Sequence, residues 1–229
     1  MTMRKTVKDP RRRLVGVIAS QADLQFAAQI KQPPDLFELR LDCFCAVVDR
    51  IERKLSILRA PKIITARDPR EGGTGDLSFA RRRALLSRFL PHAKYVDVEL
   101  RSARAFRPLL AQARKRNVRV ILSFHDFKST PSSRSLHAKA RTARNYGADI
   151  FKVATRTDKP SELAQLVDFI TSKDLPLPIS AMGIGKLGAL SRLLLARCGS
   201  ILNYASFERP TIEGQLPIEL LRSALRGSK

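Results

Sequence analysis

Three features of the 229-residue sequence predict an α/β fold, a single-domain (β/α)8 TIM barrel. Short runs rich in β-branched and aliphatic residues alternate with amphipathic stretches, as in parallel strands joined by crossover helices. There are eight such runs, the number that closes a barrel. No Gly-rich phosphate turn follows the first run, although such a turn usually marks the alternative fold, a doubly wound open sheet.

The predicted strands and helices alternate along the whole chain. Strands are expected where apolar residues run together or alternate with polar ones, at residues 14–20, 36–43, 62–68, 95–100, 119–127, 149–155, 177–183 and 200–206. Helices are expected where one face is apolar, at residues 23–32, 79–90, 103–116, 133–146, 161–172, 187–197 and 218–226. Residues 14–229 are predicted to form the barrel, and the basic segment 1–13 a flexible arm.

Five of the predicted strands carry a polar face, because residues two apart in a strand point to the same side. The polar residues that share a side are Glu38, Arg40 and Asp42; Thr65 and Arg67; Asp97 and Glu99; Ser123 and His125; and Lys152. Any one such strand could belong to an antiparallel sheet with a wet face. In a barrel, helices cover the outside, so the polar face points inward. Buried charged groups must pair or serve a site, which predicts a catalytic pocket.

Lys152 is the least expected of these residues, because it lies in the apolar run Asp149-Ile-Phe-Lys-Val-Ala-Thr155. An unpaired ammonium in a buried strand is costly, and burial favours the neutral amine, which can attack a carbonyl carbon. The alternative is a strand-end lysine whose amine reaches water. This segment alone leaves both interpretations open.

The formal net charge of +22, from 43 basic and 21 acidic residues, raises the question of nucleic-acid binding. The basic clusters 11–13, 81–83 and 114–119 lie in separate segments, and few aromatic rings (11 Phe, 3 Tyr, no Trp) are present to stack on bases. We therefore expect no nucleic-acid partner. A basic surface that attracts an anionic metabolite is the alternative explanation.

The sequence predicts a soluble, cytoplasmic protein with no membrane segment and no metal. No apolar stretch reaches the roughly 18 residues that span a bilayer. The odd number of cysteines, Cys43, Cys45 and Cys198, indicates free thiols in a reducing compartment. Cys43 and Cys45 form a lone C-x-C without a second Cys/His pair, so no zinc site is expected.

Several segments resemble, in order along nearly the whole chain, the motifs of type I 3-dehydroquinate dehydratases. They are Glu38-Leu-Arg-Leu-Asp42, Thr65-Ala-Arg-Asp-Pro-Arg-Glu-Gly-Gly73, Asp97-Val-Glu99, Ser123-Phe-His-Asp-Phe127 with Thr130-Pro131, Phe151-Lys-Val-Ala154, Ser191-Arg192 and Gly214-Gln215. The resemblance implies a (β/α)8 hydro-lyase of the shikimate pathway, which serves aromatic amino acid biosynthesis. It also implies 3-dehydroquinate as the substrate and a homodimer.

The resemblance makes Lys152 the amine that forms an imine with the C3 ketone of the substrate. The protonated imine is an electron sink, so no cofactor is implied. His125 resembles the general acid/base that takes a proton from C2 and returns one to the departing C1 hydroxyl. Glu71 resembles the carboxylate that orients this histidine. Taken alone, His125 would more commonly be a core histidine with satisfied hydrogen bonds, but its place beside the matched lysine strand favours the catalytic role.

The remaining candidate site residues would bind the substrate. Arg192 resembles the arginine that binds its carboxylate, although from the sequence alone it could lie on a helix surface. The residues that resemble the pocket lining and the closing loop are Glu38, Arg40 and Arg67, and Thr211 and Gln215. Asp42, Asp97 and Glu99 are expected to pair with other side chains.

Three positions depart from the family pattern. Thr211 stands where a serine is common and keeps a hydroxyl. Glu213 stands where a proline is common and would add flexibility and a negative charge near an anionic substrate, and Ile184 stands where a methionine is usual. A class I aldolase-type barrel would share the imine lysine but should show a phosphate site in its last two loops. Gly183, Gly185 and Gly188 permit such a site, whereas Arg192 fits a carboxylate better.

Overall fold

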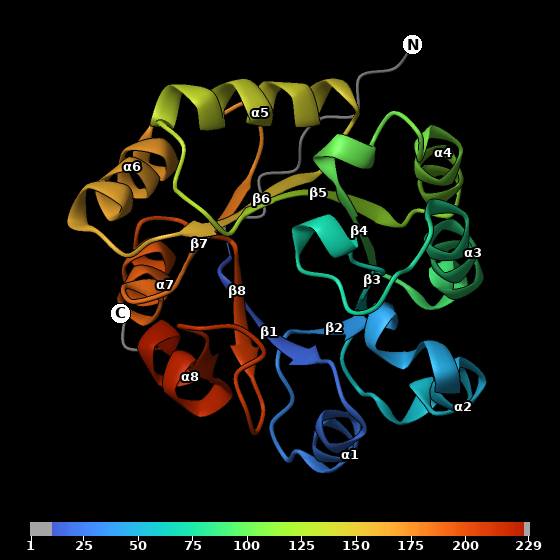
Figure 1. Ribbon diagram of the computed structural model, residues 1–229. Helices are drawn as coiled ribbons and strands as arrows, with labels where there is room; N and C mark the ends of the chain where they lie inside the picture. Colours follow the sequence, from blue (N-terminus) through green and yellow to red (C-terminus); the bar gives the residue numbers. More distant parts are fainter. Residues whose placement is uncertain (1–10, 227–229) are drawn as a thin grey trace.

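In the computed structural model, which describes residues 11–226, parallel strands form the centre of the molecule and helices surround them (Figure 1). The strands are β1 (Arg13–Ile18), β2 (Leu36–Arg40), β3 (Lys62–Thr65), β4 (Tyr95–Glu99), β5 (Arg119–Asp126), β6 (Ile150–Arg156), β7 (Ile179–Ile184), β8 (Leu202–Ser206) and β9 (Leu216–Pro217). Their order in the sheet is β7-β6-β5-β4-β3-β2-β1-β8-β9. All eight predicted strands are confirmed, and the short β9 is an addition.

Strands β1 to β8 close into a barrel. The backbone N–H of Ile201 donates to the carbonyl of Ile179 over 3.0 Å, and the hydroxyl of Ser180 donates to the carbonyl of Leu202 over 2.7 Å. These bonds join the start of β8 to β7, at the opposite end of the sheet from its ladder with β1. The predicted (β/α)8 barrel is therefore confirmed, and the doubly wound open sheet is excluded.

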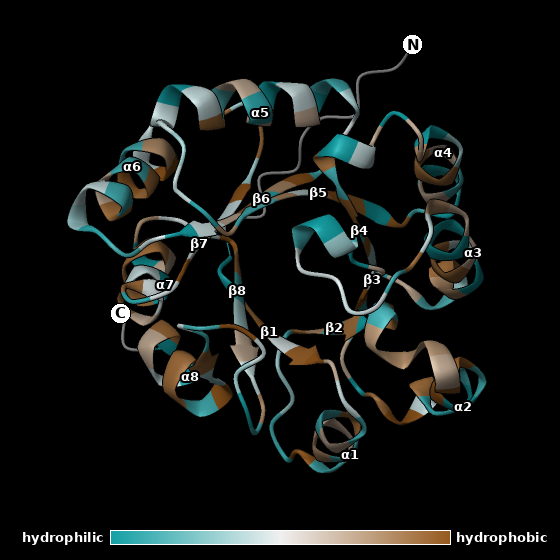
Figure 2. Cartoon of the chain, in the orientation of Figure 1, coloured by the Kyte–Doolittle hydropathy of each residue, from teal (hydrophilic) through white to brown (hydrophobic). Residues whose placement is uncertain are grey.

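The helices are α1 (Gln21–Gln29), α2 (Val48–Arg53), α3 (Phe79–Phe89), α4 (Arg107–Lys115), α5 (Ser133–Asn145), α6 (Pro160–Thr171), α7 (Gly188–Arg197) and α8 (Ile218–Arg226). In α5 the buried residues Leu136, Ala140 and Ala143 recur with the helical period. Figure 2 shows hydrophilic and hydrophobic residues on the same helices, as expected for helices with one buried face.

Two helices differ from the sequence-based expectation. The helix predicted from residue 103 begins only at Arg107, because Pro108 in the first turn lacks an N–H and suits a helix start. The helix α2 was not predicted. It has six residues, lacks a side-chain cap and lies between 3-10 turns, so it is too short to show a helical period.

Two apolar cores lie on opposite faces of the sheet. Outward-facing strand residues, such as Val96 and Leu122, pack against the helices. Inside the barrel, side chains at the N-terminal ends of the strands form the second core: Val15, Leu36, Ile63, Tyr95, Ile121, Ile150 and Leu202. The inward residues that follow them on several strands are polar. The polar layer therefore lies above an apolar floor, toward the C-terminal ends of the strands.

The predicted arm lies mostly outside the described part of the chain, which excludes residues 1–10 and 227–229. Arg13, the last residue of the predicted arm, is the first residue of β1, and its N–H donates to the carbonyl of Ile201 over 2.8 Å. The division between arm and barrel stays a prediction. Within residues 11–226 no helix is long and apolar enough to cross a membrane.

Candidate active site

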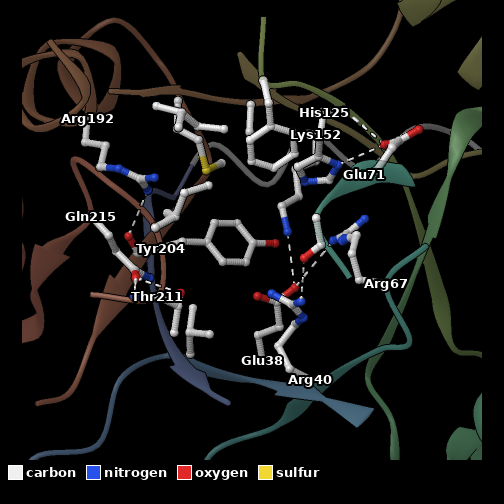
Figure 3. A pocket seen from close by; sticks show the side chains of 17 residues that line it. Glu38, Arg40, Arg67, Glu71, His125, Lys152, Arg192, Tyr204, Thr211 and Gln215 are labelled. Carbon is white, nitrogen blue, oxygen red and sulfur yellow. Dashed lines mark hydrogen bonds and ion pairs between the residues drawn. The ribbon is translucent and has the colours of Figure 1, made fainter. Parts of the chain in front are cut away.

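Lys152 points from β6 into the barrel and is 4% exposed (Figure 3). Its Nζ donates to Glu38 Oε1 over 3.1 Å and to Asp97 Oδ2 over 3.0 Å. The alternative of a lysine that reaches water is therefore wrong. The ammonium lies between two carboxylates, which compensate for the loss of hydration.

Arg67 connects these carboxylates to the neighbouring strands. Its guanidinium donates to Asp97 over 3.2 and 3.0 Å, to Glu99 over 3.2 Å and to the hydroxyl of Ser123 over 2.6 Å. Burial alone would lower the pKa of Arg67, but Asp97 and Glu99 raise it overall. Burial likewise opposes ionisation of Asp97, yet Arg67 and Lys152 hold its pKa far below the usual range. The polar layer is thus charged and internally paired.

Asp42 and Glu99 bind arginine side chains next to this layer. Asp42 binds Arg40 Nε and Nη2 over 3.0 and 2.7 Å and accepts the backbone N–H groups of Arg67 and Thr74. Glu99 pairs with Arg82 as well as with Arg67. Asp42, Asp97 and Glu99 therefore pair with other side chains, as expected from the sequence.

His125 and Glu71 form a hydrogen-bonded pair at the mouth of the barrel. His125 lies near the end of β5, and its Nδ1 is 3.0 Å from Glu71 Oε2, which also accepts the backbone N–H of His125 over 3.0 Å. Glu71 is held by a single 3-10 turn, Pro69–Glu71. Asp68 caps this turn, and Gly72 closes it at φ 83°.

Burial shifts the titration of both partners. The pKa of Glu71 is raised to about 7, by burial and then by the charge of Glu99. The pKa of His125 is lowered well below its ordinary value, by burial and then by the positive charges of Arg67 and Lys152. The imidazole is therefore neutral at neutral pH and can accept a proton.

Arg192, on α7, is a buried cation without an acidic partner among residues 11–226. It is 5% exposed, so the alternative of a surface arginine is wrong. Its Nη1 donates to the backbone carbonyl of Tyr204 over 3.2 Å, whereas its Nε has no partner in the described part of the chain. Burial lowers its pKa to about 10. Such a group is ready to bind an anion.

The segment between β8 and β9 brings Thr211 and Gln215 over the pocket. The backbone N–H and the hydroxyl of Thr211 donate to Gln215 Oε1 over 2.8 and 2.9 Å. Gly214, at φ 82°, packs against Gly188, where a Cβ on either residue would meet backbone atoms. The two glycines therefore serve close packing of this segment on the start of α7.

Glu213, whose effect on the closing segment stays a prediction, forms an ion pair in the structure. Its carboxylate is not among the groups that line the pocket, and it pairs with Arg156 Nη1 over 3.0 Å. Its backbone carbonyl accepts the N–H of Gly185 over 3.2 Å. The negative charge of Glu213 is therefore paired with a positive one. Ile184 does line the cavity, as an apolar wall residue.

One cavity of ≈ 170 Å³ brings all nine predicted site residues together (Figure 3). They are Lys152, His125, Glu71, Glu38, Arg40, Arg67, Arg192, Thr211 and Gln215. The sequence reasoning missed Tyr204 and Phe127, which also line it. Tyr204 shares the inward parity of Leu202 on β8, a signal that places it inside the barrel but does not distinguish a site residue from a core residue. In residues 11–226 no group of three or more potential ligands could hold a metal ion.

The fold and this pocket define a (β/α)8-barrel enzyme, with its site at the C-terminal ends of the strands. Residues 15–229 match the family model described as type I 3-dehydroquinase. The chain belongs to the type I 3-dehydroquinase family.

Relatives named as 3-dehydroquinate dehydratases match nearly the whole chain. A 3-dehydroquinate dehydratase of Shouchella clausii is 33% identical over 225 residues, which is 93% of this chain and 88% of that protein. The enzyme of the same name from Thermococcus onnurineus is 31% identical and covers 93% of this chain and 96% of its own. The crystal structure of 3-dehydroquinate dehydratase from Geobacillus kaustophilus superposes with a TM-score of 0.86, at 28% identity, over 94% of this chain and 90% of that one.

Proposed function

We propose that the chain dehydrates 3-dehydroquinate to 3-dehydroshikimate through an imine on Lys152. Family membership makes it a hydro-lyase of the shikimate pathway. The observation that supports this mechanism best is the meeting of a buried lysine, a neutral histidine and an unpaired arginine in one cavity. These groups supply a nucleophile, a base and an anion-binding site.

Imine formation begins when Nζ of Lys152 gives up one ammonium proton and the neutral amine attacks C3 of the ketone, whose C–O π electrons move to oxygen. That oxygen leaves as water with the two protons that the lysine ammonium loses on becoming a protonated imine. Glu38 and Asp97, at 3.1 and 3.0 Å from Nζ, are placed to hold the amine and to pass on its protons. Their negative charge also stabilises the cationic imine.

His125 then removes a proton from C2, and the C–H electrons flow into the imine to give an enamine. The enamine electrons return to expel the C1 hydroxyl, which takes the proton from His125 and leaves as water. Another water hydrolyses the imine and restores Lys152. One water is lost overall. Glu71 keeps Nδ1 of His125 protonated, which leaves Nε2 free to act as the base.

The Glu71→Gln variant is expected to change the pH profile. Glu71 must be ionised to accept the Nδ1 proton, so wild-type kcat/KM should rise as pH increases through about 7, the pKa of Glu71. Glutamine does not titrate, so kcat/KM of the variant should be lower and flat across this range. Steady-state kinetics from pH 5.5 to about 9 measures this. If kcat/KM of the variant still rose near pH 7, the group that titrates there would not be Glu71.

Substrate binding would use the remaining pocket residues. Arg192 would bind the carboxylate, because its guanidinium is buried without an acidic partner in the described chain. Glu38, Arg40 and Arg67 would contact ring hydroxyls. Thr211 and Gln215, already hydrogen-bonded to each other, would cover the ring and exclude water.

The Arg192→Met variant is expected to raise KM by about 10²-fold or more, because a charged hydrogen-bonding partner of the substrate is lost. The variant should be at least as stable as wild type, since it removes a buried charge that has no acidic partner in residues 11–226. Substrate titrations and thermal unfolding measure the two effects. The matched control is Arg197→Met, which replaces an exposed arginine on the same helix and should leave KM unchanged. Equal KM values in both variants would refute the role of Arg192.

An absorbance assay for the enone product tests the proposed function itself. Purified protein with 3-dehydroquinate should form 3-dehydroshikimate without added metal or cofactor. Absence of product from folded protein would exclude the activity. The predicted homodimer also stays a proposal, and light scattering would test it.

A further inference from the structure

Tyr204 is a pocket residue whose hydroxyl has no partner. It points from β8 into the barrel and is 3% exposed. Its buried Oη has no hydrogen-bond partner in residues 11–226. An unpaired buried hydroxyl destabilises a folded protein. Such a group in an enzyme pocket therefore points to a ligand that completes its hydrogen bonding.

The position of Tyr204 connects it to two cations of the site, Lys152 and Arg192. Lys152 Nζ lies 3.9 Å from the ring centroid, at the distance of a cation–π contact. The backbone carbonyl of Tyr204 accepts from Arg192 Nη1. Figure 3 shows the ring extending across the pocket, with its hydroxyl directed to the side where Lys152 lies. The hydroxyl is therefore close to the atoms on which Lys152 would act.

We propose that Tyr204 contacts the substrate through its hydroxyl, which donates a hydrogen bond to the oxygen on the carbon that Lys152 attacks. This inference rests on the proposed imine mechanism. During the attack the C–O π electrons move to this oxygen, which becomes a stronger acceptor than the ketone, so a donor already in place favours the step. The oxygen then leaves as water as described above. Tyr204 exchanges no proton and only donates the hydrogen bond.

The protonation of Tyr204 suits this role. Burial raises its pKa well above the ordinary value, and the nearby carboxylates Glu38 and Asp97 raise it further. The hydroxyl therefore keeps its proton. Its ring face would also lie against the cationic imine after Lys152 has reacted, as it lies against the ammonium before.

Two tyrosine variants are expected to differ in the rate of imine formation and in the direction of the change in Tm. Tyr204→Phe keeps the ring and removes only the unpaired hydroxyl. The rate of imine formation, followed by rapid mixing and borohydride quenching, should fall about tenfold, the effect of one hydrogen bond. The Tm should rise by about 2 °C or more.

Tyr95→Phe is the control, because Tyr95 lies in the apolar floor and its hydroxyl accepts from Arg13 and Arg119 over 2.7 and 3.3 Å. This variant should lower the Tm and leave the rate of imine formation unchanged.

The outcomes separate this inference from the proposed function. If wild type is trapped by borohydride and Tyr204→Phe is trapped at the same rate, only the role of Tyr204 is refuted. If wild type forms product but no trapped adduct, the imine mechanism and the role of Tyr204 both fail. A slower rate together with a lower Tm would mean that the hydroxyl is structural, and it would also overturn the proposal.

Discussion

The Lys152→Met variant is expected to lower kcat by at least about 10⁴-fold, because methionine fills a similar volume but cannot form an imine. The variant should also lose stability. Its two partner carboxylates, Glu38 and Asp97, lose the ammonium at 3.1 and 3.0 Å. Breaking a buried ion pair lowers the free energy of unfolding by about 3–5 kcal/mol. The product assay and urea unfolding measure the two effects.

Lys152→Arg separates chemistry from stability. Arginine keeps a cation beside the two carboxylates but is not deprotonated and forms no imine. We expect it to be as inactive as Lys152→Met and more stable than that variant. Activity within tenfold of wild type in either variant would exclude Lys152 as the nucleophile.

The His125→Ala variant is expected to lower kcat by about 10²- to 10⁴-fold, the usual contribution of a general acid/base. The imine should still form, because Lys152 and its two carboxylates are untouched. Borohydride should therefore trap an adduct in a nearly inactive protein. Kinetics and intact-protein mass spectrometry on the same sample would show this combination.

His137→Ala is the matched control. His137 lies on α5, binds the backbone carbonyl of Ser133 over 2.8 Å and packs against Phe169, and it does not line the cavity. Its loss should leave kcat near the wild-type value. Equal activity of the two histidine variants would contradict the role of His125.

The strands were predictable because two independent signals agree on them. Apolar runs gave their positions, and the alternation of polar residues gave their orientation, so the inward layer around Lys152 could be inferred before any contact was known. The helix α2 could not be inferred, because six residues between 3-10 turns carry no periodic pattern. The short β9 follows the chain between Thr211 and Gln215, whose path depends on distant contacts.

The site was predictable to different degrees on strands and on loops. Strand parity alone places Lys152 and His125 inward, whereas Glu71, Arg192 and Gln215 lie on a turn, a helix and a loop segment. For these three only the family resemblance gave a role. Pairings across the chain, such as that between Arg156 and Glu213, have no local signal in the sequence.

Tyr204 was overlooked for a different reason. An aromatic residue in an apolar strand usually belongs to a core, and its inward parity was consistent with that interpretation. Its buried hydroxyl without a partner in the described chain becomes visible only in the structure. The unpaired Nε of Arg192 is evident in the same way, and both groups face the cavity of Lys152.

The central claim is the imine on Lys152, and borohydride trapping with 3-dehydroquinate tests it most directly. After reduction and proteolysis, mass spectrometry should find the adduct on the peptide that contains Lys152, and no adduct should form in Lys152→Arg. Active wild-type protein that carries no adduct, or an adduct on a different lysine, would contradict the account.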